Sequence, residues 1–408
     1  MLLSAQHPEF LRHLSTLGYG LQPIFFRREG RYALVIKASK EMILTARING
    51  GFKVYLLDDP TLFASHLGFI TAFFDDHDEP LVLKSPQFAG DDLLKDLTGL
   101  LSQPEFDVFF FDEHDRELMG VRVHNNDAAR FRSEIGQATF ASFDRAELPS
   151  IIERLDRRFS TRDAQDDARA FTLTLGERLY PDNCYFIDGR EEFYRFRRAE
   201  DSIAATTLER DKAGPYQERD IAVMLSRVFD GESIYLNPIR ADTGRELTDV
   251  LVVTDGIMMF VQAKDSPNNE ASLRRTVDRK RTTIRGHVEK AAKQLGGAIS
   301  YGKAAGDIVI RDGSGSVSVP VGNRQLLGMV VVREMFDDDY DACSAPVLEA
   351  IEEMRTPAVL LDYASLHVIA QAFRTPGRFL DALGDIFEMA MKNRRFPKPI
   401  CLGPSRQE

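Results

Sequence analysis

Cysteine is scarce in this chain of 408 residues, and its three copies, Cys184, Cys343 and Cys401, lie far apart. Scattered single cysteines exclude a cysteine-based zinc site and are typical of a reducing compartment. No apolar run approaches the length of about 20 residues that a membrane-spanning helix needs. The opening residues also lack a signal-peptide pattern. We therefore expect a cytoplasmic protein that has no membrane partner.

The chain also lacks an excess of positive charge, because 52 basic and 63 acidic residues give a net charge of −11. That balance excludes general coating of nucleic acid and restricts any such contact to a local basic patch. No Gly-x-Ser-x-Gly motif, Cys/His pair or zinc pattern occurs, so nothing supports nucleophilic catalysis by a side chain. The length predicts two or three domains with sizeable cores.

The most informative segment covers residues 246–264, where two apolar, β-branched runs are joined by Asp255-Gly256. This dipeptide is the strongest short-range signal for a two-residue hairpin turn. Such a turn places Asp249 opposite Gln262, and Lys264 projects from the same face because side chains alternate along a strand. A carboxylate, an amide oxygen and an ammonium group then converge at one end of the hairpin. A metal ion with a phosphate group would satisfy all three.

This arrangement resembles the PD-(D/E)xK nuclease superfamily, which carries an acid on one strand and (Asp/Glu/Gln)-x-Lys on the next. Gln262-Ala263-Lys264 is similar to the Gln-x-Lys variant of Mrr-type restriction enzymes, although Thr248 stands where the motif has Pro. Members of the superfamily often carry a Glu in the first helix, and Glu218 occupies that place in a helix predicted over 215–229. Some members place a Gln beside the metal, for which Gln294 is the candidate. The alternative for Gln294 is a helix-surface amide.

The expected fold is α/β with a mixed sheet, and its elements follow the order α-β-β-β-α-β of the restriction-endonuclease-like core. The predicted elements are a helix over 215–229, strands over 233–239, 247–254 and 257–264, a helix over 280–302 and a strand over 326–333. The resemblance covers residues 205–335. We expect a separate α/β domain of unknown role over 1–160, a connecting segment with short strands over 161–204, and the nuclease-like domain over 205–400.

Two segments of the N-terminal domain resemble each other, 69–84 and 107–122, because each is apolar, then acidic around a central His, then apolar again. This pattern predicts two hairpins with charged turns at His77 and His114. We favour solvated turns over a metal site there, because the ligand types sit consecutively in loops. The Gly-rich stretch 312–316 is likewise interpreted as a hairpin loop.

The resemblance implies that Mg²⁺ or Mn²⁺ is held mainly by Asp249, with Glu218, the Gln262 side chain and the Ala263 carbonyl in support. An amide at position 262 supplies an oxygen ligand without charge, so the site has one negative charge fewer than the commoner version. Lys264 would orient or deprotonate the attacking water, or stabilise charge on the phosphate. The alternative for Asp249 and Lys264 is an ion pair at the strand ends. The alternative for Glu218 is a solvated helix residue.

A basic segment follows the hairpin directly in this otherwise acidic chain. Local positive charge beside a hydrolytic centre suits a phosphate backbone, whose contacts position the nucleic acid without reading its sequence. The alternative is a solvated, salt-bridged surface. The candidate nucleic-acid-binding residues are Arg274, Arg275, Arg279, Lys280, Arg281 and Arg285.

These features together predict a metal-dependent DNA endonuclease, in the company of bacterial restriction and anti-phage defence effectors. Two alternatives remain open. One is a DNA-binding or scaffold protein that has kept the nuclease fold and lost turnover, and the other is a nuclease that acts on RNA or branched DNA. A second copy of the chain is expected because two strands must be cut. The N-terminal domain is expected to bind a partner protein or to sense a trigger.

Overall fold

The computed structural model describes residues 2–14, 18–26, 30–59, 65–142, 147–181, 184–198, 204–312, 315–336 and 338–399. The chain divides into two compact units. The first comprises residues 1–184, 207–210 and 268–275, and the second comprises 185–206, 211–267 and 276–408. Each unit combines helices with β-sheet, which confirms the predicted α/β class.

The first unit is built on a mixed sheet in which only one pair of neighbouring strands, β2 and β6, runs parallel. The strand order is β1 (Gly20–Phe26), β2 (Arg31–Lys37), β6 (Glu105–Phe111), β7 (Glu117–Asn125), β8 (Phe171–Arg178), β3 (Gly51–Asp59), β4 (Ser65–Phe73) and β5 (Leu81–Pro86). The helices are α1 (Leu3–Gln6), α2 (Pro8–Leu14), α3 (Lys40–Ile48), α4 (Asp92–Leu101), α5 (Ala128–Gln137), α6 (Leu148–Ser160), α7 (Ala164–Arg169) and α9 (Glu270–Leu273).

Both hairpins predicted for the first unit are present, as β4–β5 and β6–β7. Helix α4 lies between them in the chain and begins after Asp91, because the Asp91 carboxylate accepts a hydrogen bond from the backbone N–H of Leu93. Strand β8 lies between β7 and β3, inside the sheet. The first unit therefore extends past residue 160. It includes β8, which belongs to the segment 161–204 that was expected to connect the two domains.

The two charged turns differ in their surroundings. The turn at His77 is exposed, as predicted, whereas His114 is only 1% exposed. Buried cations surround the second turn, since Asp112 Oδ2 lies 2.7 Å from Lys40 Nζ and 2.8 Å from Arg116 Nε. The prediction of a solvated turn at His114 is wrong because the acids there are neutralised by ion pairs within the unit, which allows the turn to be buried.

The second unit contains a sheet whose central hairpin has the predicted register. Val250 pairs with Val261 and Val253 with Met258, so Asp255 and Gly256 lie in the turn. The strand order is β10 (Arg197–Arg198), β12 (Ile234–Leu236), β14 (Val250–Val253), β15 (Ile257–Lys264), β18 (Gln325–Val332) and β19 (Ala358–Asp362). The main helices are α8 (Gly214–Leu225), α10 (Val277–Ala304), α11 (Tyr340–Met354), α12 (Tyr363–Ala372) and α13 (Pro376–Asn393).

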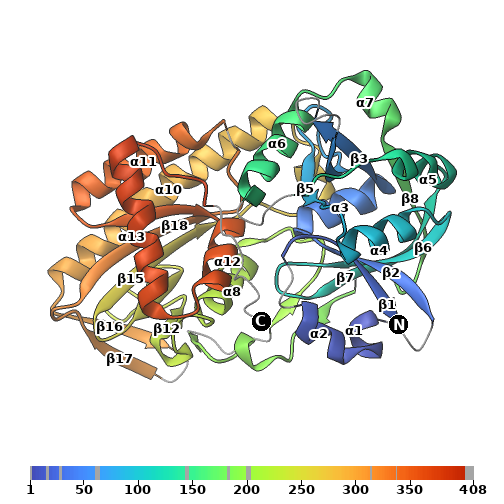
Figure 1. Ribbon diagram of the computed structural model, residues 1–408. Helices are drawn as coiled ribbons and strands as arrows, with labels where there is room; N and C mark the ends of the chain where they lie inside the picture. The colour runs from blue at the N-terminus through green and yellow to red at the C-terminus, as the bar shows by residue number, and fades with distance from the viewer. Residues whose placement is uncertain are drawn as a thin grey trace. The chain divides into compact units, whose positions relative to one another are not determined.

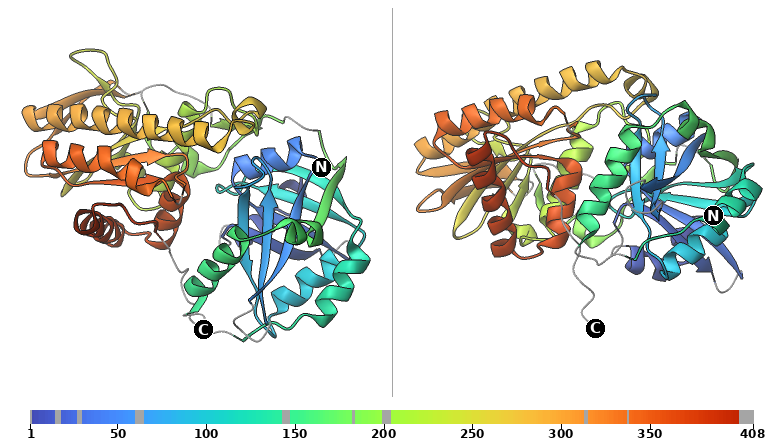
Figure 2. Two further views of the ribbon diagram at one scale, coloured as in Figure 1. Left: turned by 90° about the horizontal axis from the view of Figure 1, so that it is seen from above. Right: turned by 45° about the horizontal axis from the view of Figure 1, so that its top comes forward.

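Helices cover both faces of this sheet (Figures 1 and 2). Helix α10 lies against β15 and β18 with α11 beside it, while α8 packs against β12, β14 and β15 and contacts α12. Strand β15 is buried along nearly its whole length, as expected for a strand covered on both sides. Helix α10 also forms the crossover between the parallel strands β15 and β18.

The order α8, β12, β14, β15, α10, β18 is the one predicted. The chain inserts a further hairpin between α10 and β18, formed by β16 (Asp307–Asp312) and β17 (Gly315–Pro320), which pairs with β13 (Ile239–Arg240). This is the hairpin predicted from the Gly-rich stretch, although residues 313 and 314 lie outside the described residues. The remaining short elements are β9 (Phe186–Ile187), β11 (Ala205–Thr206), and the 3₁₀ turns η2 (Glu191–Phe193) and η3 (Gly231–Ser233).

The tail beyond β18 belongs to the second unit, as predicted, and contributes α11, β19, α12 and α13. Cys401 lies outside the described residues. None of the helices in the described part of the chain combines the length and the apolar character that crossing a bilayer requires.

Candidate functional site

Asp249, Ala263 and Lys264 meet at the open end of the β14–β15 hairpin. Asp249 immediately precedes β14, and its Oδ2 atom accepts a hydrogen bond of 2.5 Å from the backbone N–H of Ala263. The same oxygen lies 3.5 Å from Lys264 Nζ, which also donates a 2.7 Å hydrogen bond to the Ala263 carbonyl. The predicted acid and amine are therefore in contact. This geometry matches the ion-pair alternative as well as a hydrolytic site.

Gln262 is held by Thr248 so that its amide oxygen remains without a partner. The Thr248 hydroxyl donates a 2.6 Å hydrogen bond to the Val261 carbonyl, so the hydroxyl can only accept from a second group. It accepts from Gln262 Nε2 at 3.2 Å. Gln262 is only 4% exposed, and its Oε1 atom has no hydrogen-bond partner among the described residues. A buried amide oxygen without a partner is a costly arrangement that a cation or a donor would relieve.

Asn237 links the first-helix acid to the hairpin. Its side-chain amide donates a 3.1 Å hydrogen bond to Glu218 Oε2, and its backbone N–H donates to the Asp249 carbonyl at 2.9 Å. Asn237 adopts the left-handed conformation, with φ of 51°, which asparagine tolerates better than most residues. Burial and the nearby Asp249 carboxylate raise the pKa of Glu218. Glu218 is thus a half-buried member of the acidic group and not the solvated residue of the alternative interpretation.

Glu246 is a further acid at this site that the sequence did not single out. Its outer surface is exposed, but its carboxyl group faces Asp249 and the cavity described below. Burial of that group and the neighbouring charge of Asp249 raise the pKa of Glu246 to about 8. The only signal in the sequence was its position three residues before Asp249.

A cavity of about 290 Å³ opens beside the hairpin end. One wall is formed by the segment that leads into β14 together with Gln262, and the other by α10. Gln294, predicted as an accessory residue, lies on that helix and shares the cavity with Gln262. The lining residues are Arg240, Glu246, Leu247, Thr248, Asp249, Gln262, Gln294, Gly297, Ala298 and Tyr301.

The donor set at this end of the hairpin suits a hard divalent cation. Carboxylates, an amide oxygen and a backbone carbonyl are the ligands that Mg²⁺ and Mn²⁺ prefer. The unpartnered Gln262 oxygen and the raised pKa values of Glu218 and Glu246 both indicate a shortage of positive charge. Side chains must still rotate to hold an ion, because the carboxylate oxygens of these two acids and Asp249 are not all within 4.8 Å of one another in the described structure.

The raised pKa of Glu246 predicts how the stability of the metal-free protein depends on pH. Between its ordinary value of 4.5 and about 8, Glu246 keeps its proton in the folded state and loses it on unfolding. The folded state then binds more protons, so the free energy of unfolding falls as the pH rises through this range. Glu246→Gln, which stays neutral, should flatten that fall. Thermal unfolding of both proteins in EDTA at about pH 5 and about pH 8 measures it, and parallel pH profiles would contradict it.

The six basic residues divide between the two units. Arg274 and Arg275 follow α9 in the first unit, whereas the other four belong to the first turns of α10 in the second. Arg274 pairs with Glu270, Arg281 pairs with Asp338, and Arg285 pairs with Asp339. The salt-bridged surface named as the alternative therefore describes at least these positions of the segment.

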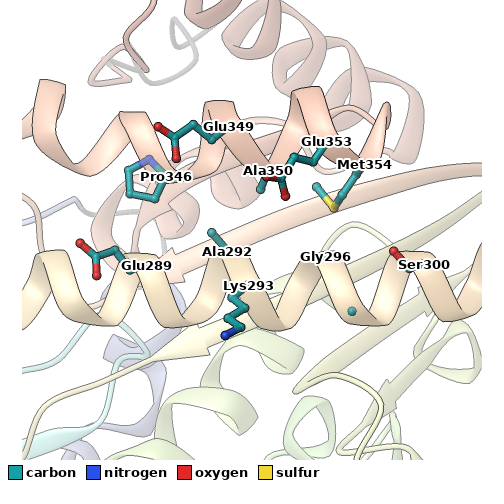
Figure 3. A pocket seen from close by; sticks show the side chains of 11 residues that line it. Glu289, Ala292, Lys293, Gly296, Ser300, Pro346, Glu349, Ala350, Glu353 and Met354 are labelled. Carbon is teal, nitrogen blue, oxygen red and sulfur yellow. The ribbon is translucent and has the colours of Figure 1, made fainter.

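A larger cavity of about 540 Å³ lies between α10 and α11 (Figure 3). Its lining includes the acids Glu289, Glu349 and Glu353 and small residues such as Gly296, while the Lys293 side chain points away from α11. Only Gly297 is shared with the smaller cavity, and none of the predicted site residues lines this one. The cavity with the larger volume is therefore not the one that the predicted site residues line.

Comparison of the chain with models of protein families, with curated proteins and with solved structures finds no match to any of them. The assignment of a function therefore depends on the chain's own residues.

Proposed function

We propose that the second unit is a metal-dependent nuclease of the restriction-endonuclease-like class that hydrolyses phosphodiester bonds in DNA. The observation that carries this proposal is the hairpin end, where Asp249 contacts both Ala263 and Lys264 beside the unpartnered Gln262 oxygen. The element order α8, β12, β14, β15, α10, β18 supports it, because it is the order of that nuclease core.

Each residue would have a separate task. Asp249, Glu218, Glu246 and the Gln262 amide oxygen would hold Mg²⁺ or Mn²⁺, which when bound lowers the pKa of a water molecule and polarises the phosphate. The Lys264 ammonium would orient the attacking water or stabilise the charge that develops on the phosphate. Lys264 now donates to the Ala263 carbonyl, whose oxygen has a second lone pair with which it could support the metal ion. Glu246 restores the negative charge that Gln262 does not provide.

The arginines and Lys280 of the basic segment would position the phosphate backbone. Such contacts carry affinity but no sequence information. A second copy of the chain would be needed for a double-strand break, and the first unit would respond to a trigger or a partner protein. A restriction or anti-phage role rests only on the resemblance of Gln262-Ala263-Lys264 to the motif of Mrr-type enzymes.

Cleavage assays test the proposal directly. Pure protein is incubated with plasmid, linear and single-stranded DNA and with RNA, in Mg²⁺, in Mn²⁺ or in EDTA. We expect cleavage of DNA with either metal and none in EDTA, because the metal ion would supply the activated water and the polarised phosphate. Binding without cleavage in every metal condition would favour the scaffold alternative, which the Lys264–Asp249 ion pair and the neutral amide of Gln262 also fit. A preference for RNA or branched DNA would favour the third alternative.

A further inference from the structure

The cavity beside the hairpin end contains a stacked pair whose role the proposed hydrolysis does not explain. Arg240 comes from β13 and Tyr301 from the C-terminal part of α10. The guanidinium carbon of Arg240 lies 3.6 Å from the centre of the Tyr301 ring. Asp242 holds one edge of the guanidinium group, with contacts of 3.0 Å to Arg240 Nε and 2.6 Å to Arg240 Nη2. The plane of the arginine is therefore fixed before any ligand binds.

A fixed guanidinium plane offers a stacking surface. One face of Arg240 is against Tyr301 and one edge is against Asp242, so a ligand in the cavity that Arg240 lines can reach the opposite face and the N–H groups that Asp242 does not engage. The Arg240 side chain is 25% exposed, which leaves room for that contact. Arginine planes and aromatic rings are the surfaces on which proteins stack unpaired nucleobases.

Gln262 provides the second, independent observation. Its Oε1 atom is buried, has no partner among the described residues, and belongs to a side chain that lines the same cavity. An amide oxygen held in this way accepts a hydrogen bond from an amino or ring N–H group of the kind that nucleobases carry on their edges. An amide oxygen has two lone pairs, so the Gln262 oxygen can accept this bond while it also serves the proposed metal site.

The size of the cavity limits what it can accept. Its volume of about 290 Å³ lies just below the range of about 300–1,000 Å³ for small-molecule sites. A single nucleotide fits such a space, whereas the stacked base pairs of a duplex do not. Enzymes that need one base in a pocket act on single strands or extrude the base from the duplex.

We propose that this cavity binds one unpaired nucleobase beside the scissile phosphate, with the base stacked on the Arg240–Tyr301 pair and bonded to Gln262. The substrate class is then single-stranded or branched nucleic acid in preference to a continuous duplex. This inference rests on the proposed function, because Asp249 and Gln262 line the same cavity. It adds the substrate class to that function.

Binding of 2-aminopurine oligonucleotides in Ca²⁺ tests the inference, because stacking quenches this base and the readout does not require cleavage. Arg240→Lys should weaken single-strand binding about 5- to 150-fold, the effect of losing one stacked base, since lysine keeps the charge but not the plane. Tyr301→Ala removes the ring that supports this plane and should weaken binding by up to the same factor. Tyr301→Phe keeps the ring and should bind normally. Arg311→Ala, which removes an exposed arginine of β16 outside the cavity, is the matched control.

The outcomes separate this inference from the proposed function. Tighter binding of continuous duplex than of single strands, or wild-type single-strand binding by folded Tyr301→Ala and Arg240→Lys, overturns the inference. If the metal-dependent enzyme cuts duplex and these variants do not alter binding, only the inference fails. If single strands bind with the expected pattern and no metal brings cleavage, the proposed nuclease activity fails while the base-binding site stands.

Discussion

Replacing Lys264 with alanine is expected to lower the rate of metal-dependent cleavage by about 10²- to 10⁴-fold, the usual contribution of a positioned proton-transfer group. Lys264 is the cation at the hairpin end, 3.5 Å from Asp249 Oδ2, and its side chain is 18% exposed. Without its ammonium group, neither the attacking water nor the charge on the phosphate has a partner from this strand. Single-turnover cleavage at saturating metal concentration measures the effect.

Lys264→Ala also removes the partner of a largely buried carboxylate, so thermal unfolding must accompany the kinetics. Lys293→Ala is the matched control, because Lys293 is an exposed lysine of α10 that lines only the larger cavity. We expect the control to cleave like the wild type. A folded Lys264→Ala protein with wild-type cleavage would show that Lys264 serves only as the strand-end ion-pair partner of Asp249.

The second large effect is expected from Asp249→Asn, which should weaken the binding of Mg²⁺ and Mn²⁺ by about 100-fold or more. Losing a residue that only supports a metal ligand costs about 10- to 100-fold in metal affinity, and the loss of a proposed direct ligand should cost more. Asp249 is the acid closest to Lys264 and Ala263, and its charge raises the pKa values of Glu218 and Glu246. Asparagine keeps an oxygen that accepts the Ala263 N–H, so the hairpin end should stay folded while the ligand charge is lost.

The hairpin and its register could be predicted because the signals are local. Asp255-Gly256 fixes the turn, and alternation along the strands then places Asp249, Gln262 and Lys264 on one face. The helical spacing of apolar residues in α10 is an equally local signal. It predicted the helix that carries Gln294, and Gln294 lines the same cavity as Gln262. The mixed α/β class followed from the order of such elements.

The rest of the site depends on contacts between distant segments. Arg240 reaches the cavity, and the ring of Tyr301, through the pairing of β13 with β16, and that pairing left no local signal in the sequence. Neither residue carries a motif. The buried turn at His114 is a similar case, since Lys40 neutralises Asp112 from another element of the first unit. Long-range ion pairs of this kind leave no periodic pattern in a sequence.

Calorimetric titration of the metal-free protein with Mn²⁺ and with Mg²⁺ tests the central claim most directly, with Asp249→Asn and Glu289→Gln compared against the wild type. Glu289→Gln removes one acid from the exposed surface of α10, outside the proposed site. The account predicts binding by the wild type and by Glu289→Gln, and a loss of binding in Asp249→Asn. Absence of binding in the wild type, or equal binding by all three proteins, would contradict a metal site at the end of this hairpin.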